Sequence, residues 1–132
     1  MKKKLLSLAL VLCFALAACS TAEPPDLTGN WKESGSDTEE SYQEATITED
    51  SIEIYWVSDG GDTKALYWAG TFEAPTTAEE PYSWDSANDK EKTSTALLAS
   101  NDDTKTFTYE DGQISYEVSA LGVTSTVSLE PQ

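Results

Sequence analysis

The chain has 132 residues and a net charge of −16, from 24 acidic residues and eight basic ones, all of them lysine. The absence of histidine and arginine excludes Ser-His and Cys-His nucleophile pairs, histidine-based zinc sites and arginine clamps for phosphate. Nucleic acid repels so acidic a chain, and no glycine-rich phosphate-binding motif occurs, so we expect neither nucleic acid nor nucleotide as a partner.

Residues 1–18 are predicted to be a helical secretory signal peptide. A basic start, Met1 to Lys4, precedes an apolar run from Leu5 to Leu16, and small residues follow. The run of about a dozen residues is shorter than the roughly 20 that a membrane-spanning helix needs. Cleavage removes three lysines and no acidic residue, which leaves five basic against 24 acidic side chains.

The tetrapeptide Leu16-Ala17-Ala18-Cys19 stands directly after this apolar run and resembles the bacterial lipobox. The resemblance implies cleavage between Ala18 and Cys19, a diacylglyceryl group on Cys19 Sγ, and acylation of the new amino group, as with palmitate. The protein is then expected at the cell membrane, on the extracytoplasmic face, because two or more acyl chains anchor stably. The alternative is an ordinary signal peptide with a chance cysteine.

The mature chain is expected to hold one domain and to be a monomer. Residues 19–26 form a lipidated cysteine with a short, proline-stiffened tether, and residues 27–132 form the domain. Cys13 leaves with the signal peptide, so Cys19 has no partner for an intramolecular disulfide. The domain must therefore be stabilised by its core.

From Leu27 onward the hydrophobic period is two, and the composition favours strands. Asp111-Gly112 is typical of a type I′ hairpin turn. Pairing outward from it predicts five cross-strand pairs: Glu110–Gln113, Tyr109–Ile114, Thr108–Ser115, Phe107–Tyr116 and Thr106–Glu117. A second hairpin, turning at Glu49-Asp50, predicts three more: Ile47–Ile52, Thr46–Glu53 and Ala45–Ile54.

Further strands are expected at Thr28–Lys32, Lys64–Phe72 and Thr93–Ser100, and a last one follows a turn near Leu121-Gly122. The middle strand should direct Leu66, Trp68 and Phe72 to one face. The last should direct Val123, Val127 and Leu129 to the core face. Glu73 to Lys92 is expected to be a polar loop with three apolar anchors, Pro81, Tyr82 and Trp84.

About eight short antiparallel strands joined by tight turns predict an all-β meander that closes into a small barrel, or alternatively a β-sandwich. Gly29-Asn30-Trp31 resembles the G-x-W motif that opens the first strand in the lipocalin-like superfamily. By that resemblance, Gly29 and Trp31 are structural positions, and the tryptophan plugs the closed end of a lipocalin-like barrel.

Candidates for chemistry are few. The adjacent acids, such as Glu79-Glu80 and Asp102-Asp103, fall in predicted turns, where solvation leaves them unsuited to acid–base catalysis, so we expect no catalytic residues and no enzyme. Asp59-Gly-Gly-Asp62 and the segment Asp85–Asp89 contain oxygen ligands of the kind calcium takes, but turn chemistry explains both, and no metal or other cofactor is expected.

Aromatic residues supply the binding hypothesis. Ile54, Trp56, Trp68, Phe107 and Tyr116 are predicted to face the interior, where they form either a packed core or the lining of a pocket for a small apolar ligand. Two functions stay open for a non-enzymatic surface lipoprotein. The first is binding of an apolar ligand in the barrel, and the second is a filled core whose acidic surface engages a basic envelope, phage or peptide partner.

Overall fold

The computed structural model describes residues 22–35, 40–120 and 122–132. The predicted signal peptide, with Ala18 and Cys19 at its cleavage point, lies outside these residues. No helix in the described part of the chain is both long enough and apolar enough to cross a membrane. The elements in chain order are β1 (Gly29–Glu33), β2 (Tyr42–Ile47), β3 (Ser51–Ser58), the 3-10 turn η2 (Asp59–Gly61), β4 (Thr63–Thr71), β5 (Tyr82–Ala87), the short helix α2 (Lys90–Thr93), β6 (Thr104–Glu110), β7 (Gln113–Ala120) and β8 (Val123–Pro131).

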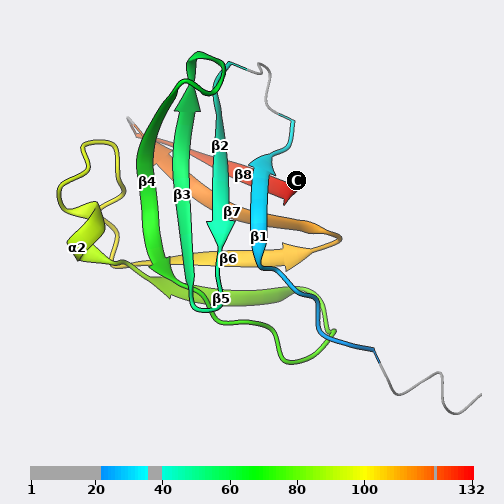
Figure 1. Ribbon diagram of the computed structural model, residues 1–132. Coiled ribbons are helices and arrows are strands. Elements are labelled where there is room, and N and C mark those ends of the chain that lie inside the picture. The colour runs from blue at the N-terminus through cyan, green and yellow to red at the C-terminus, as the bar shows by residue number, and fades with distance from the viewer. Residues whose placement is uncertain (1–21, 36–39, 121) are drawn as a thin grey trace, which may run out of the picture.

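The eight strands form one antiparallel sheet in the order β4-β3-β2-β1-β8-β7-β6-β5. Strand β1 pairs with both β2 and β8, so the sheet curls round and brings its two ends, β4 and β5, together (Figure 1). There a single bridge joins Gly70 to Asn88. The result is a nearly closed barrel, which confirms the predicted all-β meander and excludes the sandwich.

Both predicted hairpins form, and their registers near the turns are confirmed. Strands β2 and β3 pair Ala45 with Ile54, Thr46 with Glu53, and Ile47 with Ile52. Strands β6 and β7 pair in the predicted register from Glu110–Gln113 to Thr108–Ser115. The turn residues Asp111 and Gly112 have φ values of 53° and 81°, the positive values that a type I′ turn requires.

The two outer pairs predicted for this hairpin, Phe107–Tyr116 and Thr106–Glu117, are wrong. The β6–β7 ladder stops at Thr108–Ser115, whereas β5–β6 and β7–β8 continue along their strands. Beyond that point β6 stays paired with β5, and β7 stays paired with β8. Lys105 Nζ donates to the carbonyl O of Glu117 at 2.9 Å, so a side chain occupies a backbone acceptor that a strand partner would otherwise take.

The prediction of a strand at Thr93–Ser100 is also wrong. The barrel strand between β4 and β6 in the chain is instead β5, which lies within the segment predicted to be a polar loop. In β5 the side chains of Tyr82, Trp84 and Ser86 face inward. Because Ser86 is polar, the alternation of apolar and polar residues that marks a strand was not evident in the sequence. The segment after β5 instead begins α2, which Asp89 caps by accepting from the N–H of Glu91. It returns along the outside of β4.

A β-bulge in β4 changes which side chains face inward. Opposite β3, Ile54 pairs with Trp68 but Tyr55 pairs with Leu66, so Tyr67 is the extra residue. Trp68 and Phe72 face the core as predicted. Leu66, predicted to share that face, lies partly exposed on the other, and Tyr67 is buried in its place.

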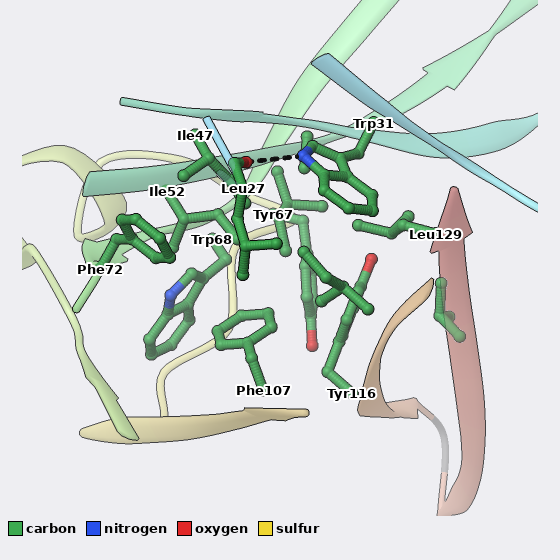
Figure 2. Packing of buried hydrophobic residues seen from close by; sticks show 14 of the residues in the cluster. Leu27, Trp31, Ile47, Ile52, Tyr67, Trp68, Phe72, Phe107, Tyr116 and Leu129 are labelled. Atoms are coloured by element: carbon green, nitrogen blue, oxygen red, sulfur yellow. Dashed lines mark hydrogen bonds between the residues drawn. The ribbon is translucent and has the colours of Figure 1, made fainter. Parts of the chain in front are cut away.

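Among the described residues, the barrel interior holds a packed cluster of sixteen buried residues, drawn from all eight strands, from Leu27 before β1 and from Phe72 after β4; Figure 2 shows most of them. Trp31 is buried toward one end of the barrel, where its ring meets Tyr109 edge-on and its indole N–H donates to the carbonyl O of Leu27 at 2.9 Å. Rings of Trp84 and Phe107 stack with centroids 5.1 Å apart, and Phe72 meets Trp84 edge-on. On β8, Val127 and Leu129 are buried as predicted, but Val123 is 64% exposed because it lies beyond the cluster.

Candidate functional site

The end of the barrel away from Trp31 is hollowed, and we call it the mouth. Its central residues are Trp56, Tyr67, Val118, Ser119 and Asp102. One hollow of about 430 Å³ lies among these five residues and the chain from Leu98 to Asn101. A second, of about 340 Å³, shares Trp56 and Val118 with the first and continues toward β1 and β8. The two hollows of the mouth are therefore neighbours that have Trp56 and Val118 as a common border.

Trp56 is the aromatic wall that the two hollows share. It is only partly buried and packs against the rim of the core cluster. Tyr67 meets it edge-on, with ring centroids 5.4 Å apart and an interplanar angle of 71°. Because the bulge in β4 turns Tyr67 inward, this aromatic pair depends on one irregular residue in an otherwise regular strand.

Apolar side chains also stand exposed around the mouth. Leu97 is 99% exposed, Leu98 is 58% exposed and Val123 is 64% exposed. The segment carrying the two leucines is attached to the barrel where the N–H of Ser100 donates to the carbonyl O of Tyr67 at 2.9 Å, and Trp56 Nε1 approaches the carbonyl O of Leu98 at 3.4 Å. Large exposed apolar residues beside a hollow are typical of binding surfaces.

Lys105 is a buried cation between the mouth and the core, with a relative exposure of 8%. Its Nζ lies 5.2 Å from the ring centroid of Tyr67 and 5.5 Å from that of Trp68, and 3.8 Å from Asp102 Oδ2. Burial lowers the pKa of this ammonium group, and the charges of Asp102 and Glu117 partly oppose that effect. Desolvation disfavours the charged form, and the ring faces and carboxylates compensate in part.

A polar group is also enclosed in the interior near the mouth. The Tyr116 hydroxyl donates to Oε1 of the fully buried Gln43, whose backbone N–H donates to Glu33 Oε1 at 2.9 Å. Among the described residues, Gln43 Nε2 has no hydrogen-bond partner. Burial raises the pKa of Tyr116 well above its ordinary value, and nearby Tyr67 and Glu33 reinforce the shift. This half of the barrel is thus less apolar than the Trp31 end.

The five residues predicted to line a pocket separate into two groups. Ile54, Trp68, Phe107 and Tyr116 belong to the packed cluster. The rings of Phe107 and Tyr116, labelled in Figure 2, have centroids 5.2 Å apart. Trp56 alone borders the hollows of the mouth. The interior positions were therefore predicted correctly as inward-facing, and the structure fills the space between four of them with side chains.

Sequence reasoning missed Tyr67, Lys105 and the exposed leucines, and it placed Val118 on the core face without proposing it as a site residue. Lys105 carried a readable signal, because the alternation that places Phe107 inward also places residue 105 inward. Val118 shares the face of Tyr116 in the same way. Nothing in the sequence indicated Tyr67, since a bulge is not visible in a two-residue period.

The acidic segments considered for calcium serve other purposes. Asp59 lies in η2, Asp85 accepts a hydrogen bond from Thr106 Oγ1 at 2.6 Å, and Asp89 caps α2. Within the residues that the structure describes, no three acidic, cysteine or histidine side chains converge as a metal site would require.

Comparisons with known proteins found no relative of this chain. No family matches. Neither a protein-family model, nor a curated protein sequence, nor a solved structure is significantly similar to the chain.

Proposed function

We propose that this chain is a non-enzymatic lipoprotein, anchored through Cys19 at the extracytoplasmic face of the membrane, whose barrel binds a small apolar ligand at its mouth. The observation that carries the proposal is Trp56, a half-buried aromatic wall shared by hollows of about 430 and 340 Å³. Pockets for small molecules are concave and mostly apolar, with a few polar groups that orient the ligand. Tyr67, Val118 and Leu98 supply apolar surface, and Ser119 and Asp102 supply polar edges.

The ligand is placed at the mouth and not deep in the barrel because the cluster around Trp68 and Phe107 already fills the interior. Removing such residues to make room would cost several kcal/mol each, on the order of 3–5 for a large aromatic side chain. A ligand seated against Trp56 and Tyr67 needs no such rearrangement. Its apolar part would cover exposed carbon surface at roughly 25 cal/mol per Å².

Ligand binding is tested with N-phenyl-1-naphthylamine, a neutral fluorescent apolar probe that the acidic surface does not repel. We expect saturable binding with a blue shift of probe emission, weakened about ten-fold by Trp56→Ala, since a lost aromatic contact is worth on the order of 1.4 kcal/mol or more. Tyr55→Ala is the matched control, because Tyr55 is the aromatic neighbour of Trp56 on β3 but does not line either hollow. Absence of saturable binding, or equal binding by the Trp56→Ala variant, contradicts the proposal.

Anchoring is tested separately, in bacteria that express the full chain with an alkyne-tagged fatty acid in the medium. The wild-type protein should carry the label and should fractionate with the membrane, and the Cys19→Ser variant should do neither. The Cys13→Ser variant is the control, because residue 13 lies in the segment that is expected to be removed. Unlabelled protein released into the medium would overturn the anchor.

A second candidate function has its own support in the filled core and the net charge of −16. In it the barrel is an interaction module whose acidic surface engages a basic partner, such as an envelope protein, a phage component or a cationic peptide. It predicts binding that is lost above about 0.5 M salt, where the Debye length falls to a few Å. Salt-insensitive capture of a partner would count against it.

A further inference from the structure

We propose that the gap between β6 and β7 is a binding groove for an extended cationic peptide, which enters as an additional strand. The groove shares Asp102 and Ser119 with the neighbouring hollow of the mouth, but Trp56 does not line it, and the proposal does not depend on ligand binding against Trp56. It gives the second candidate function a location and a partner chemistry.

The first observation is that two neighbouring strands separate while each keeps its other partner. Past Thr108–Ser115, β6 has no ladder with β7, yet it pairs with β5 as far as Thr104–Ala87. Likewise β7 pairs with β8 as far as Ala120–Val123. Each strand thus presents to the gap an edge with no strand partner, on which the Glu117 carbonyl O accepts from Lys105 Nζ. Edges without a strand partner are templates for strand addition.

The direction of the backbone groups follows from the turn. Glu110 and Gln113 flank a two-residue turn, so they form a hydrogen-bonded pair, and bonding then alternates along the ladder. The backbone N–H and C=O groups of Thr106 and Thr104 are therefore directed toward β7, and those of Glu117 and Ser119 toward β6. The contact from Lys105 Nζ to the carbonyl O of Glu117 agrees with this direction.

The second observation is a hollow of about 510 Å³ over these same stretches. Its sides are the outward-facing residues of both strands, and Lys105 and Tyr116 form its floor. The lining residues are Asp102, Thr104, Lys105, Thr106, Thr108, Ser115, Tyr116, Glu117, Ser119 and Thr126. Apart from Asp102 and Glu117, the residues on the sides are threonines and serines, whose short side chains take up little room in the groove.

Charge decides the kind of peptide. Asp102 and Glu117 contribute two carboxylates to the groove, and the only cation among its lining residues, Lys105, is already held by the Glu117 carbonyl, Asp102 and two aromatic rings. Since side chains of a strand alternate, those of an inserted peptide that point outward would lie near the carboxylates. Those that point inward would meet the Lys105 and Tyr116 floor. The fitting sequence therefore alternates cationic and apolar residues.

The test uses the acetylated, amidated peptide Lys-Val-Lys-Val-Lys and amide hydrogen exchange followed by NMR on the folded domain, residues 22–132. In the free protein the amides of Thr106 and Ser119 should exchange faster than those of Lys105 and Phe107, which face β5. Addition of the peptide should slow exchange at Thr106 and Ser119. Exchange that is already slow at both residues, or that the peptide leaves unchanged, overturns the proposal.

Two matched comparisons separate strand pairing from simple charge attraction. The same peptide N-methylated at its valines keeps its charge but lacks two donors, and it should bind about ten-fold more weakly, since each backbone hydrogen bond contributes on the order of 0.5–1.5 kcal/mol. Thr106→Pro removes one N–H from the edge and should also weaken binding, whereas Thr106→Val keeps the N–H and should not. Equal binding of the methylated peptide leaves charge alone as the cause and refutes the proposal.

Further experiments test whether the groove binds another class of molecule. Protection of the same amides by the neutral trisaccharide maltotriose, with none by the peptide, would assign the groove to sugar and overturn the proposal. Trp56→Ala should leave peptide binding unchanged, and Thr106→Pro should leave N-phenyl-1-naphthylamine binding unchanged. Failure of the mouth proposal is therefore distinguishable from failure of this one.

Discussion

The indole N–H of Trp68 donates a hydrogen bond to Oγ of Ser86 at 3.0 Å, and both residues are fully buried. The bond joins β4 to β5, the two strands that meet where the barrel closes. Further contacts support the same closure: the N–H of Ala87 donates to Thr71 Oγ1 at 2.9 Å, and Trp84 Nε1 donates to the carbonyl O of Thr71 at 3.2 Å. Side chains thus complete a closure that backbone pairing leaves to one bridge.

Ser86→Ala should destabilise the barrel by about 1–3 kcal/mol, the cost of leaving a buried donor without an acceptor. Urea unfolding followed by tryptophan fluorescence measures the change. Ser83→Ala is the matched control on the same strand, because its hydroxyl contact to Thr108 is exposed; it should change stability by no more than about 0.5 kcal/mol. Equal stability of the two variants would show that the Trp68–Ser86 bond does not hold the closure.

Gly70→Ala should be destabilising for a steric reason at the same place. A Cβ at residue 70 would overlap Ser86 Oγ and would lie 2.6 Å from Trp68 Nε1 and 2.7 Å from the carbonyl O of Ala87. Overpacking of this kind costs about 1–3 kcal/mol, since a backbone atom cannot move aside cheaply. Thermal unfolding measures the effect, and an unchanged midpoint would show that β4 and β5 lie farther apart than the structure has them.

Gln43 and Tyr116 should show strong non-additivity. Tyr116→Phe leaves the Gln43 amide without its partner, and Gln43→Met leaves the Tyr116 hydroxyl without an acceptor, so each should cost about 1–2 kcal/mol. The double variant removes both polar groups, including the unpartnered Nε2, and should cost less than the sum by about 1 kcal/mol or more. A double-mutant cycle in urea measures this coupling. Simple additivity would mean that the two residues do not depend on each other.

Stability should fall at alkaline pH partly because of Tyr67. Burial raises the pKa of Tyr67 to about 12, and the charge of Asp102 adds to the shift. A folded-state pKa above the unfolded value of about 10 means that the neutral phenol stabilises the fold. That contribution is complete below about pH 10 and is lost as the pH rises toward about 12.

The comparison of wild type with Tyr67→Phe isolates this effect, because both proteins retain Lys105 and the other tyrosines. Unfolding free energy measured between pH 9 and about 12 should decline less steeply in the variant. Absorbance titration at 295 nm should show one fewer tyrosine ionising near the top of this range. Parallel pH profiles for the two proteins would contradict the assigned pKa shift.

Local pattern in the sequence was enough for the two hairpin turns and for the register next to them. Asp111-Gly112 requires a turn with positive φ, and the alternation on either side allows one register, because a slip of one residue would expose the apolar face of the strand. The same reasoning located β1, β4 and β8 and predicted an all-β meander. It also directed Ile54, Trp68, Phe107 and Tyr116 inward, since burial follows from the two-residue period alone.

Only the tertiary structure decided which segment completes the barrel, where the strands separate and where the bulge lies. Ser86 reads as polar in the sequence but is inward, because Trp68, from another strand, supplies its partner. Tyr67 is turned inward by the bulge that forms where β4 pairs with β3. Strands β6 and β7 separate because each stays paired with its other neighbour. These features depend on contacts between residues distant in the chain, so the local hydrophobic periodicity does not predict them. The mouth and the groove both arise from these features.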